Sequence, residues 1–127
     1  MTIKSLKELV SEANRHIETI SAEDALALSK KTGVLFVDVR ESEELQKTGK
    51  IAGALHVPRG MLEPQVDPTS PMHKLALNES ETLVLYCATG GRSALAAKTL
   101  KDMGVENAVN VAGGFPALQN AGLPVEK

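Results

Sequence analysis

The sequence is poor in aromatic residues and in cysteine, and each shortage excludes a class of protein. Aromatic residues are 2% of the 127 residues, and they are Phe36, Tyr86 and Phe115. So few rings cannot form a surface on which the bases of single-stranded nucleic acid stack. The single cysteine, Cys87, excludes an internal disulfide and a zinc or iron–sulfur site built from several thiolates. A lone free thiol suits the reducing conditions of the cytoplasm, which is the location we expect.

Charge and hydropathy exclude further partners. The 14 lysines and arginines are balanced by 16 aspartates and glutamates, and no segment is basic enough to follow a phosphate backbone, so nucleic acid is not expected. The N-terminus, MTIKSLKELVSE, has no apolar run of signal-peptide or membrane-spanning length, so we expect no membrane association. The three histidines are scattered without a pair at helical spacing, and we expect neither a metal nor another cofactor.

The remaining composition supports one aliphatic core. Apolar residues make up 43% of the chain, which fits a single domain that needs no disulfide or metal for stability. Leu6, Leu9, Val10 and Ala13 repeat with the period of a helix, which predicts a helical extension over residues 1–16 ahead of a domain over residues 17–127. This apolar helix face must cover another surface, and both the flank of its own domain and a dimer contact fit the pattern.

Strand and helix patterns alternate along the domain, which predicts an α/β fold with a central, mostly parallel sheet of five strands flanked by helices on both faces. Residues 34–39 and 82–86 are continuous apolar runs, typical of strands covered on both sides. Shorter strands are expected at 17–20, 54–57 and 108–111, and helices at 21–32, 41–47, 92–103 and 115–120. Residues 58–80 hold four of the six prolines, which predicts a long excursion with one short helix, bordering the functional site.

The segment with the clearest chemistry begins at Cys87, directly after the strand predicted at 82–86. It continues as Ala88-Thr89-Gly90-Gly91-Arg92-Ser93 into a helical pattern. In an open α/β sheet, ligands bind where the carboxyl end of a strand turns into a helix. A short loop with two glycines can direct backbone N–H groups inward, and the helix N-terminus adds unpaired amides and a positive dipole end. We therefore expect this loop and Arg92 to hold Cys87 as a reactive thiolate rather than as an inert buried thiol.

This loop resembles the active-site loop of the rhodanese-like sulfurtransferases, and other segments agree in the same order along the chain. Asp38-Val39-Arg40-Glu41 resembles the family motif D-V-R-E, and residues 49–58 resemble its G-H-I-P-G-A-x-x-I-P segment. Gly113-Gly114 resembles the glycine pair that opens the last helix of the family. The resemblance spans residues 17–125. It implies a rhodanese-like domain, with a five-stranded parallel sheet between helices and a cysteine that carries a sulfane sulfur as a persulfide.

The resemblance implies a sulfurtransferase that moves sulfur from a small-molecule donor such as thiosulfate to a thiol, cyanide or protein acceptor. Cys87 is the expected nucleophile. Arg92 is expected to hold the loop and anionic donors, and the persulfide-binding loop would comprise Ala88, Thr89, Gly90, Gly91 and Ser93. Ser93 is expected either to donate a hydrogen bond to the sulfur or to cap the helix. Asp38 and Arg40 are expected to brace the site, with Asp38 paired with a loop group or in an ordinary surface ion pair.

Two other functions stay open at this point. Ala88 stands where many family members carry arginine, so a cation for a dianionic donor is missing. This favours a non-catalytic persulfide carrier or an anion-sensing module that acts on a protein partner. A cysteine-dependent phosphatase or arsenate reductase is less favoured, because the phosphatase relatives of this fold place one residue more between cysteine and arginine than the four, 88–91, found here. The smaller loop suits one terminal sulfur better than three phosphoryl oxygens.

Overall fold

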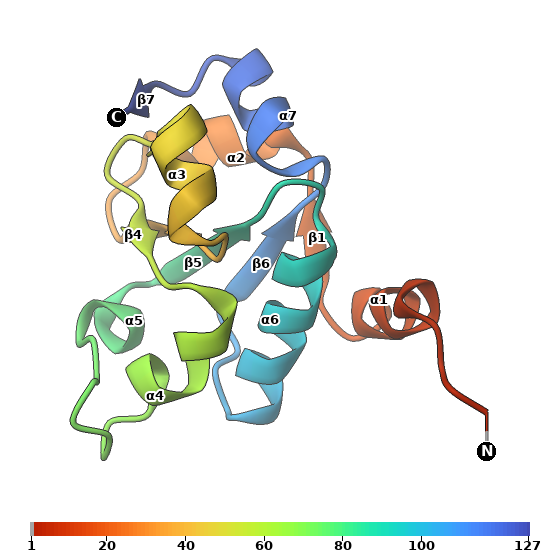
Figure 1. The fold of residues 1–127 in the computed structure, drawn as a ribbon. Helices are drawn as coiled ribbons and strands as arrows, with labels where there is room; N and C mark the ends of the chain where they lie inside the picture. Colours follow the sequence, from red (N-terminus) through yellow and green to blue (C-terminus); the bar gives the residue numbers. More distant parts are fainter. Residues whose placement is uncertain (1) are drawn as a thin grey trace.

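The computed structural model describes residues 2–127, and its central layer is a sheet of five parallel strands (Figure 1). The order across this sheet is β1-β6-β5-β2-β4, and every neighbouring pair runs parallel. The strands are β1 (Glu18–Ile20), β2 (Val34–Asp38), β4 (Leu55–His56), β5 (Thr82–Tyr86) and β6 (Ala108–Val111). The predicted α/β fold with a parallel five-stranded sheet is confirmed.

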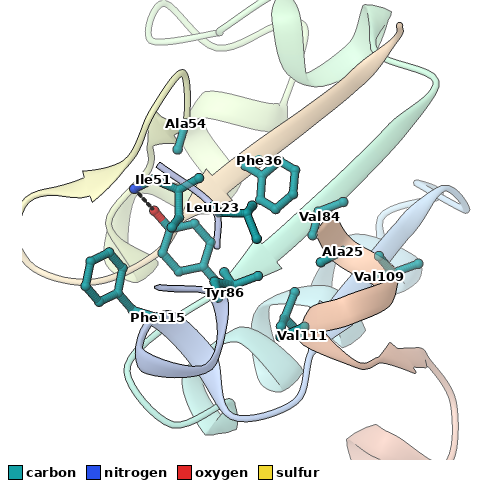
Figure 2. Packing of buried hydrophobic residues seen from close by; sticks show 12 residues of the cluster. Ala25, Phe36, Ile51, Ala54, Val84, Tyr86, Val109, Val111, Phe115 and Leu123 are labelled. Carbon is teal, nitrogen blue, oxygen red and sulfur yellow. Dashed lines mark hydrogen bonds between the residues drawn. The ribbon is translucent and has the colours of Figure 1, made fainter. Parts of the chain in front are cut away.

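Helices cover both faces of the sheet, and each face has its own apolar cluster. The helices are α1 (Leu6–Asn14), α2 (Ala22–Ser29), α3 (Ser42–Thr48), α4 (Leu62–Val66), α5 (Ala76–Glu79), α6 (Gly91–Asp102) and α7 (Gly114–Ala121). Residues of α2 and α7 share one cluster with Val84 and Tyr86, and Figure 2 shows part of it. Residues of α4, α5 and α6 share the other cluster with Leu85 and Cys87. Successive residues of a strand point to opposite faces, so Tyr86 and Cys87 belong to different clusters.

The predicted helices form, with ends that shift by a few residues. Ser5 caps α1, since its hydroxyl accepts from the Glu8 amide at 3.0 Å and the Glu8 carboxylate accepts from the Ser5 amide at 3.3 Å. Ser21 caps α2, accepting from the Asp24 amide at 3.0 Å, but the helix ends at Ser29 instead of the predicted residue 32. Across residues 2–127, no helix combines the length and the apolar character needed to cross a lipid bilayer.

The apolar face of α1 is only partly covered. Ala13 is buried and Val10 is half-buried on the side of α1 that packs against α6, whereas Leu6 and Leu9 are 68% and 41% exposed. Packing on the flank of the same chain therefore accounts for about half of the predicted apolar face. This half places α1 beside the first turn of α6.

Residues 58–80 differ from the prediction of a functional excursion with one short helix. They form a 3-10 turn, η1 (Arg59–Met61), followed by two α-helices, α4 and α5. Leu62 and Leu77 of these helices are fully buried in the cluster that also holds Leu100 of α6. Only the start of the segment lies at the carboxyl edge of the sheet, where the Arg59 amide donates to the Val39 carbonyl. The segment therefore contributes to the core, and its start borders the carboxyl edge of the sheet as predicted.

The sequence pattern did not reveal a second sheet of two short strands. β3 (Lys50–Ile51) and β7 (Val125–Glu126) pair antiparallel, and the Lys50 ammonium forms an ion pair with Glu126. This pairing joins the C-terminal segment to the chain that follows α3. Strands of two residues are too short for hydrophobic periodicity to mark them.

The N-terminus of α7 is pressed against the chain that follows β5. Gly114 has a φ of +62°, and a Cβ at this position would lie 2.5 Å from the carbonyl oxygens of both Cys87 and Ala88. The Phe115 amide donates to the Cys87 carbonyl at 2.8 Å. Glycine alone has no Cβ to prevent this approach. The first turn of α7 therefore fixes the backbone that carries Cys87.

We expect Gly114→Ala to lower the free energy of unfolding by about 3 kcal/mol, because strain at a positive φ is added to overlap with two carbonyl groups. Gly122→Ala is the matched control, since Gly122 has a φ of +106° and a Cβ there would meet nothing within 4 Å. Backbone strain alone predicts a loss of about 1 kcal/mol for this control. Equilibrium unfolding in urea measures both values. Equal losses would show that the close approach to Cys87 and Ala88 has no part in stability.

Candidate active site

The candidate site lies where the carboxyl ends of β2 and β5 meet. Asp38, the last residue of β2, is in register with Tyr86, the last residue of β5. Cys87 follows Tyr86 directly, and the chain then turns through residues 88–90 into α6. This edge is the usual position of ligands in a parallel sheet.

The loop folds back over the cysteine sulfur. Gly90 precedes α6 with a φ of +106°, a conformation that residues with a Cβ rarely adopt. The Gly90 amide lies 3.0 Å from Cys87 Sγ, and the Ser93 hydroxyl in the first turn of α6 lies 3.4 Å from the same sulfur. The inward direction predicted for the loop amides is therefore seen at Gly90. Of the two roles expected for Ser93, the structure shows the contact with sulfur.

Cys87 is completely buried, and burial by itself raises the pKa of a thiol. Hydrogen bonds from the Ser93 hydroxyl and from the amides of Ser93, Gly90 and Thr89 act in the opposite direction. Their combined effect is larger, so the pKa of Cys87 lies below its ordinary value. The lowered pKa increases the fraction of reactive thiolate at neutral pH.

Asn110 supports the loop from the neighbouring strand, β6. Its side chain is buried, with Nδ2 donating to the Gly90 carbonyl at 3.3 Å and Oδ1 lying 2.5 Å from the Ser93 hydroxyl, whose single proton is donated either to Oδ1 or to Cys87 Sγ. Asn110 thus holds both residues that hydrogen-bond to Cys87. We did not single it out from the sequence, where its signal was one amide side chain inside an apolar strand, because a buried amide needs polar partners.

Arg92 pairs with Glu44 of α3, and its predicted contact with anionic donors stays a prediction. Its two terminal nitrogens donate to the two carboxylate oxygens of Glu44 at 2.8 and 2.9 Å. The bidentate pair raises the pKa of Arg92 and lowers that of Glu44 from 4.5 to about 2. Glu44 lies 48 residues before Arg92 in the chain, and no sequence pattern links the two positions.

Asp38 and Arg40 form a buried ion pair, which is neither of the two arrangements predicted for Asp38. Arg40 Nε and Nη2 donate to the Asp38 carboxylate at 3.0 and 2.8 Å. The terminal nitrogens of Arg40 also donate to the Thr48 hydroxyl and the Gly49 carbonyl, and its guanidinium lies 4.3 Å from the centre of the Phe115 ring. The pair therefore joins β2 to the end of α3 and to α7. It stabilises the chain around the site, but its hydrogen bonds do not reach the Cys87 loop.

The other predicted loop residues occupy the rim. Ala88 is half-buried beside α7, Thr89 is exposed at the tip of the loop, and Gly91 begins α6 next to Val10 of α1. Of the predicted loop residues, Gly90 and Ser93 thus lie against the Cys87 sulfur. Within residues 2–127, no three His, Cys, Asp or Glu side chains are clustered in a way that could hold a metal ion.

Comparison with known proteins agrees with this architecture. The family model of the rhodanese-like domain matches residues 21–121. A solved structure from Rhodopseudomonas palustris, described as a protein of unknown function and possible tyrosine phosphatase, is 45% identical, has a TM-score of 0.92, and covers 99% of this chain and 98% of its own. The polysulfide-sulfur transferase homodimer of Wolinella succinogenes is 31% identical with a TM-score of 0.71, over 94% of this chain and 85% of its own.

Curated relatives differ in how much of their length the chain matches. A sulfurtransferase of Allochromatium vinosum is 30% identical over 77% of this chain and 83% of its own length. In three other relatives, which are 34 to 36% identical, the chain spans only 56%, 38% and 64% of their length. The match in these three proteins is to one part of a longer chain.

We expect Ser93→Ala to raise the pKa of Cys87, because the variant removes a hydroxyl donor to the sulfur while Cys87 stays buried. The rate of alkylation by iodoacetamide as a function of pH measures this pKa. Ser80→Ala is the matched control, since Ser80 precedes β5 at the end of the strand opposite to Cys87. An unchanged profile in Ser93→Ala would show that the hydroxyl serves Asn110 alone.

We expect Glu44→Gln to lower the free energy of unfolding at pH 7 by about 1 kcal/mol, a small value because solvent screens this partly exposed pair. A carboxylate whose pKa is lowered on folding contributes its full stability above the pKa of the unfolded chain and loses it as pH falls through the folded value. For Glu44, whose pKa is lowered to about 2, the contribution declines as the pH falls from 4.5 towards 2.

Urea unfolding of wild type and Glu44→Gln at a series of pH values tests this dependence. We expect their difference in free energy of unfolding to vanish near pH 2. Glu63→Gln, which breaks the exposed pair of Arg59 and Glu63 on one helical turn, is the control and should cost a few tenths of a kcal/mol. A difference for Glu44→Gln that persists at pH 2 contradicts the assignment of the stability to this ion pair.

Proposed function

The chain belongs to the rhodanese-like domain family, and we propose that it is a sulfurtransferase in which Cys87 carries the transferred sulfur as a persulfide. The observation that carries this proposal is the hydrogen bonding of one buried sulfur by the Gly90 amide and the Ser93 hydroxyl. Donors aimed at this point stabilise a thiolate before transfer and a persulfide anion after it. Relatives named as a sulfurtransferase and a polysulfide-sulfur transferase support the same chemistry.

The proposed transfer has two steps with one covalent intermediate. The Cys87 thiolate attacks the outer sulfur of a donor such as thiosulfate, and a new S–S bond forms while sulfite leaves with the electron pair of the broken S–S bond. A thiolate or cyanide then attacks the outer sulfur of the persulfide, and the electron pair returns to Cys87. The cycle needs a free thiol at its start, which a reducing compartment such as the cytoplasm would provide.

The proposed transfer requires the loop to open. Cys87 has no exposed surface, so protein atoms surround its sulfur in the closed loop. Ser93 and Cys87 are buried in the core, whereas Thr89 at the tip of the loop is exposed. We therefore assign the opening movement to the tip, and the fixed position of the sulfur to the first turns of α6 and α7.

A persulfide carrier for a protein partner is the second candidate function. Arg92 is the only cation among residues 87–93, and both of its terminal nitrogens are bound to Glu44. Ala88 adds no charge to the loop. A site with so little positive charge attracts a free dianion weakly, and a partner protein that docks on the rim does not depend on such attraction.

Phosphate ester hydrolysis, suggested by the description of the Rhodopseudomonas relative, would use the same cysteine and arginine in another way. Its transition state needs donors for three phosphoryl oxygens. In this chain the pairing with Glu44 occupies the terminal nitrogens of Arg92, and only four residues separate Arg92 from Cys87. Both features favour sulfur transfer.

Intact mass after incubation with thiosulfate tests the proposed function directly. We expect the wild-type chain to gain one sulfur atom, about 32 Da, and to lose it again on addition of cyanide with release of thiocyanate. Cys87→Ser removes the nucleophile and should show no gain. A steady-state assay with thiosulfate and cyanide on the same two proteins distinguishes an enzyme from a carrier, because a carrier accepts sulfur without appreciable turnover.

Two outcomes would overturn the sulfurtransferase assignment. One is the absence of any mass gain with thiosulfate, polysulfide or an organic persulfide as the donor. The other is sulfur transfer that survives Cys87→Ser, since the sulfur would then be carried elsewhere. Hydrolysis of an aryl phosphate that is lost in Cys87→Ser would favour the phosphatase alternative.

A further inference from the structure

An apolar cavity of about 180 Å³ lies between the Cys87 loop, α3 and α7, and the two steps of sulfur transfer do not account for it. Ala88, Phe115 and Pro116 form its apolar walls, and Thr48 and Lys47 lie on the side of α3. A cavity of about 150 Å³ lined by aliphatic and aromatic side chains is large enough to hold a benzene molecule. The space beside Ala88 is therefore of the size of one small ring or a short alkyl chain.

The charged groups next to this cavity are already matched by other partners. The Arg40 guanidinium is held by the buried Asp38 carboxylate, and the Glu44 carboxylate is held by Arg92. These pairings leave a surface whose exposed atoms are almost all apolar. Lys47 is exposed at the rim and adds one positive charge there. Such a site is suited to an apolar group that carries a single negative charge nearby.

The cavity is close to the reacting sulfur along the chain. Ala88 follows Cys87 directly, so their Cα atoms are about 3.8 Å apart. Phe115 belongs to the turn of α7 that hydrogen-bonds to the Cys87 carbonyl at 2.8 Å. A larger side chain at residue 88 would project into this space. Alanine at this position therefore leaves the cavity open next to the backbone that carries the nucleophile.

We propose that this cavity binds the organic group of the sulfur donor, so that the chain prefers a monoanionic donor whose sulfane sulfur is borne by an apolar group over thiosulfate. This inference rests on the proposed function. Burial of the apolar group against Ala88 and Phe115 provides the binding free energy that the neutralised Arg92 cannot provide through charge. With a thiosulfonate, the Cys87 thiolate takes the outer sulfur as persulfide, and a sulfinate leaves with the electron pair of the broken S–S bond.

Two thiosulfonates that differ only in the organic group provide the test, with thiosulfate as the dianionic reference. The second-order rate of persulfide formation on Cys87 is measured by intact mass with benzenethiosulfonate and with methanethiosulfonate. Each rate is divided by the rate for a small free thiol in solution, which removes the intrinsic reactivity of the two donors. We expect a normalised preference of about tenfold for benzenethiosulfonate, the range that an apolar pocket gives for a modest difference in size. The normalised rate for methanethiosulfonate should in turn exceed the normalised rate for thiosulfate, which has no organic group to bury.

Ala88→Leu is designed to fill the cavity and should reduce the normalised preference to near one. Ala52→Leu makes the same change at an exposed alanine in the turn between β3 and β4, which does not line the cavity, and should keep the wild-type preference. If Ala88→Leu disturbs the loop so much that no persulfide forms, the donor ratio of the wild-type chain alone still decides the question.

The outcomes separate this inference from the proposed function. If both thiosulfonates load Cys87 with the same normalised rate, the cavity does not bind the organic group, and the sulfurtransferase assignment stands. Loading by thiosulfate alone also overturns the cavity assignment. If no donor loads Cys87, the proposed function fails and the cavity assignment fails with it.

Discussion

A buried thiolate is tolerated only when hydrogen-bond donors replace the water that it loses, and this constraint governs the region around Cys87. The donors are the Gly90 amide and the Ser93 hydroxyl. Their directions depend on the left-handed conformation of Gly90 and on Asn110, which holds both residues from the neighbouring strand. The first turn of α7 holds the Cys87 backbone from the opposite side. β6 and α7 thus hold the loop whose own donors surround the sulfur.

The two arginines near the site, Arg40 and Arg92, connect structural elements, and the charge of each is paired with a carboxylate. Arg40 is matched by Asp38 and ties the end of α3 to β2, and Arg92 is matched by Glu44 and ties α3 to α6. Both guanidinium groups therefore position α3 against the Cys87 loop. The field at the sulfur then comes chiefly from oriented backbone amides and a hydroxyl, which act over a short range. This arrangement is compatible with an apolar cavity lined by Ala88, the residue that follows Cys87.

The parts that sequence patterns predicted are those set by local chemistry. The apolar runs at 34–39 and 82–86 mark buried parallel strands, and the glycines after Cys87 mark a loop that can turn its amides inward. Other features depend on contacts between distant positions. Glu44 and Asn110 reach the loop only through the tertiary fold, and β3 pairs with β7 over two residues each. Proline content predicted an excursion with one short helix at 58–80, but the segment forms two α-helices whose side chains Leu62, Val66 and Leu77 are part of the core.

The enclosure of Cys87 implies that the proposed transfer through a persulfide would need a change in the conformation of the loop. A persulfide adds one sulfur atom at a position where the closed loop already surrounds the first one. The Cys87 carbonyl accepts a hydrogen bond from the Phe115 amide, and the Ser93 hydroxyl is hydrogen-bonded to Asn110. Both ends of the loop are therefore held in place. The added atom must therefore be accommodated by residues 88 and 89, whose side chains lie at the rim. Ala88 also lines the apolar cavity, so a movement of residues 88 and 89 that made room for a persulfide would also change one wall of that cavity.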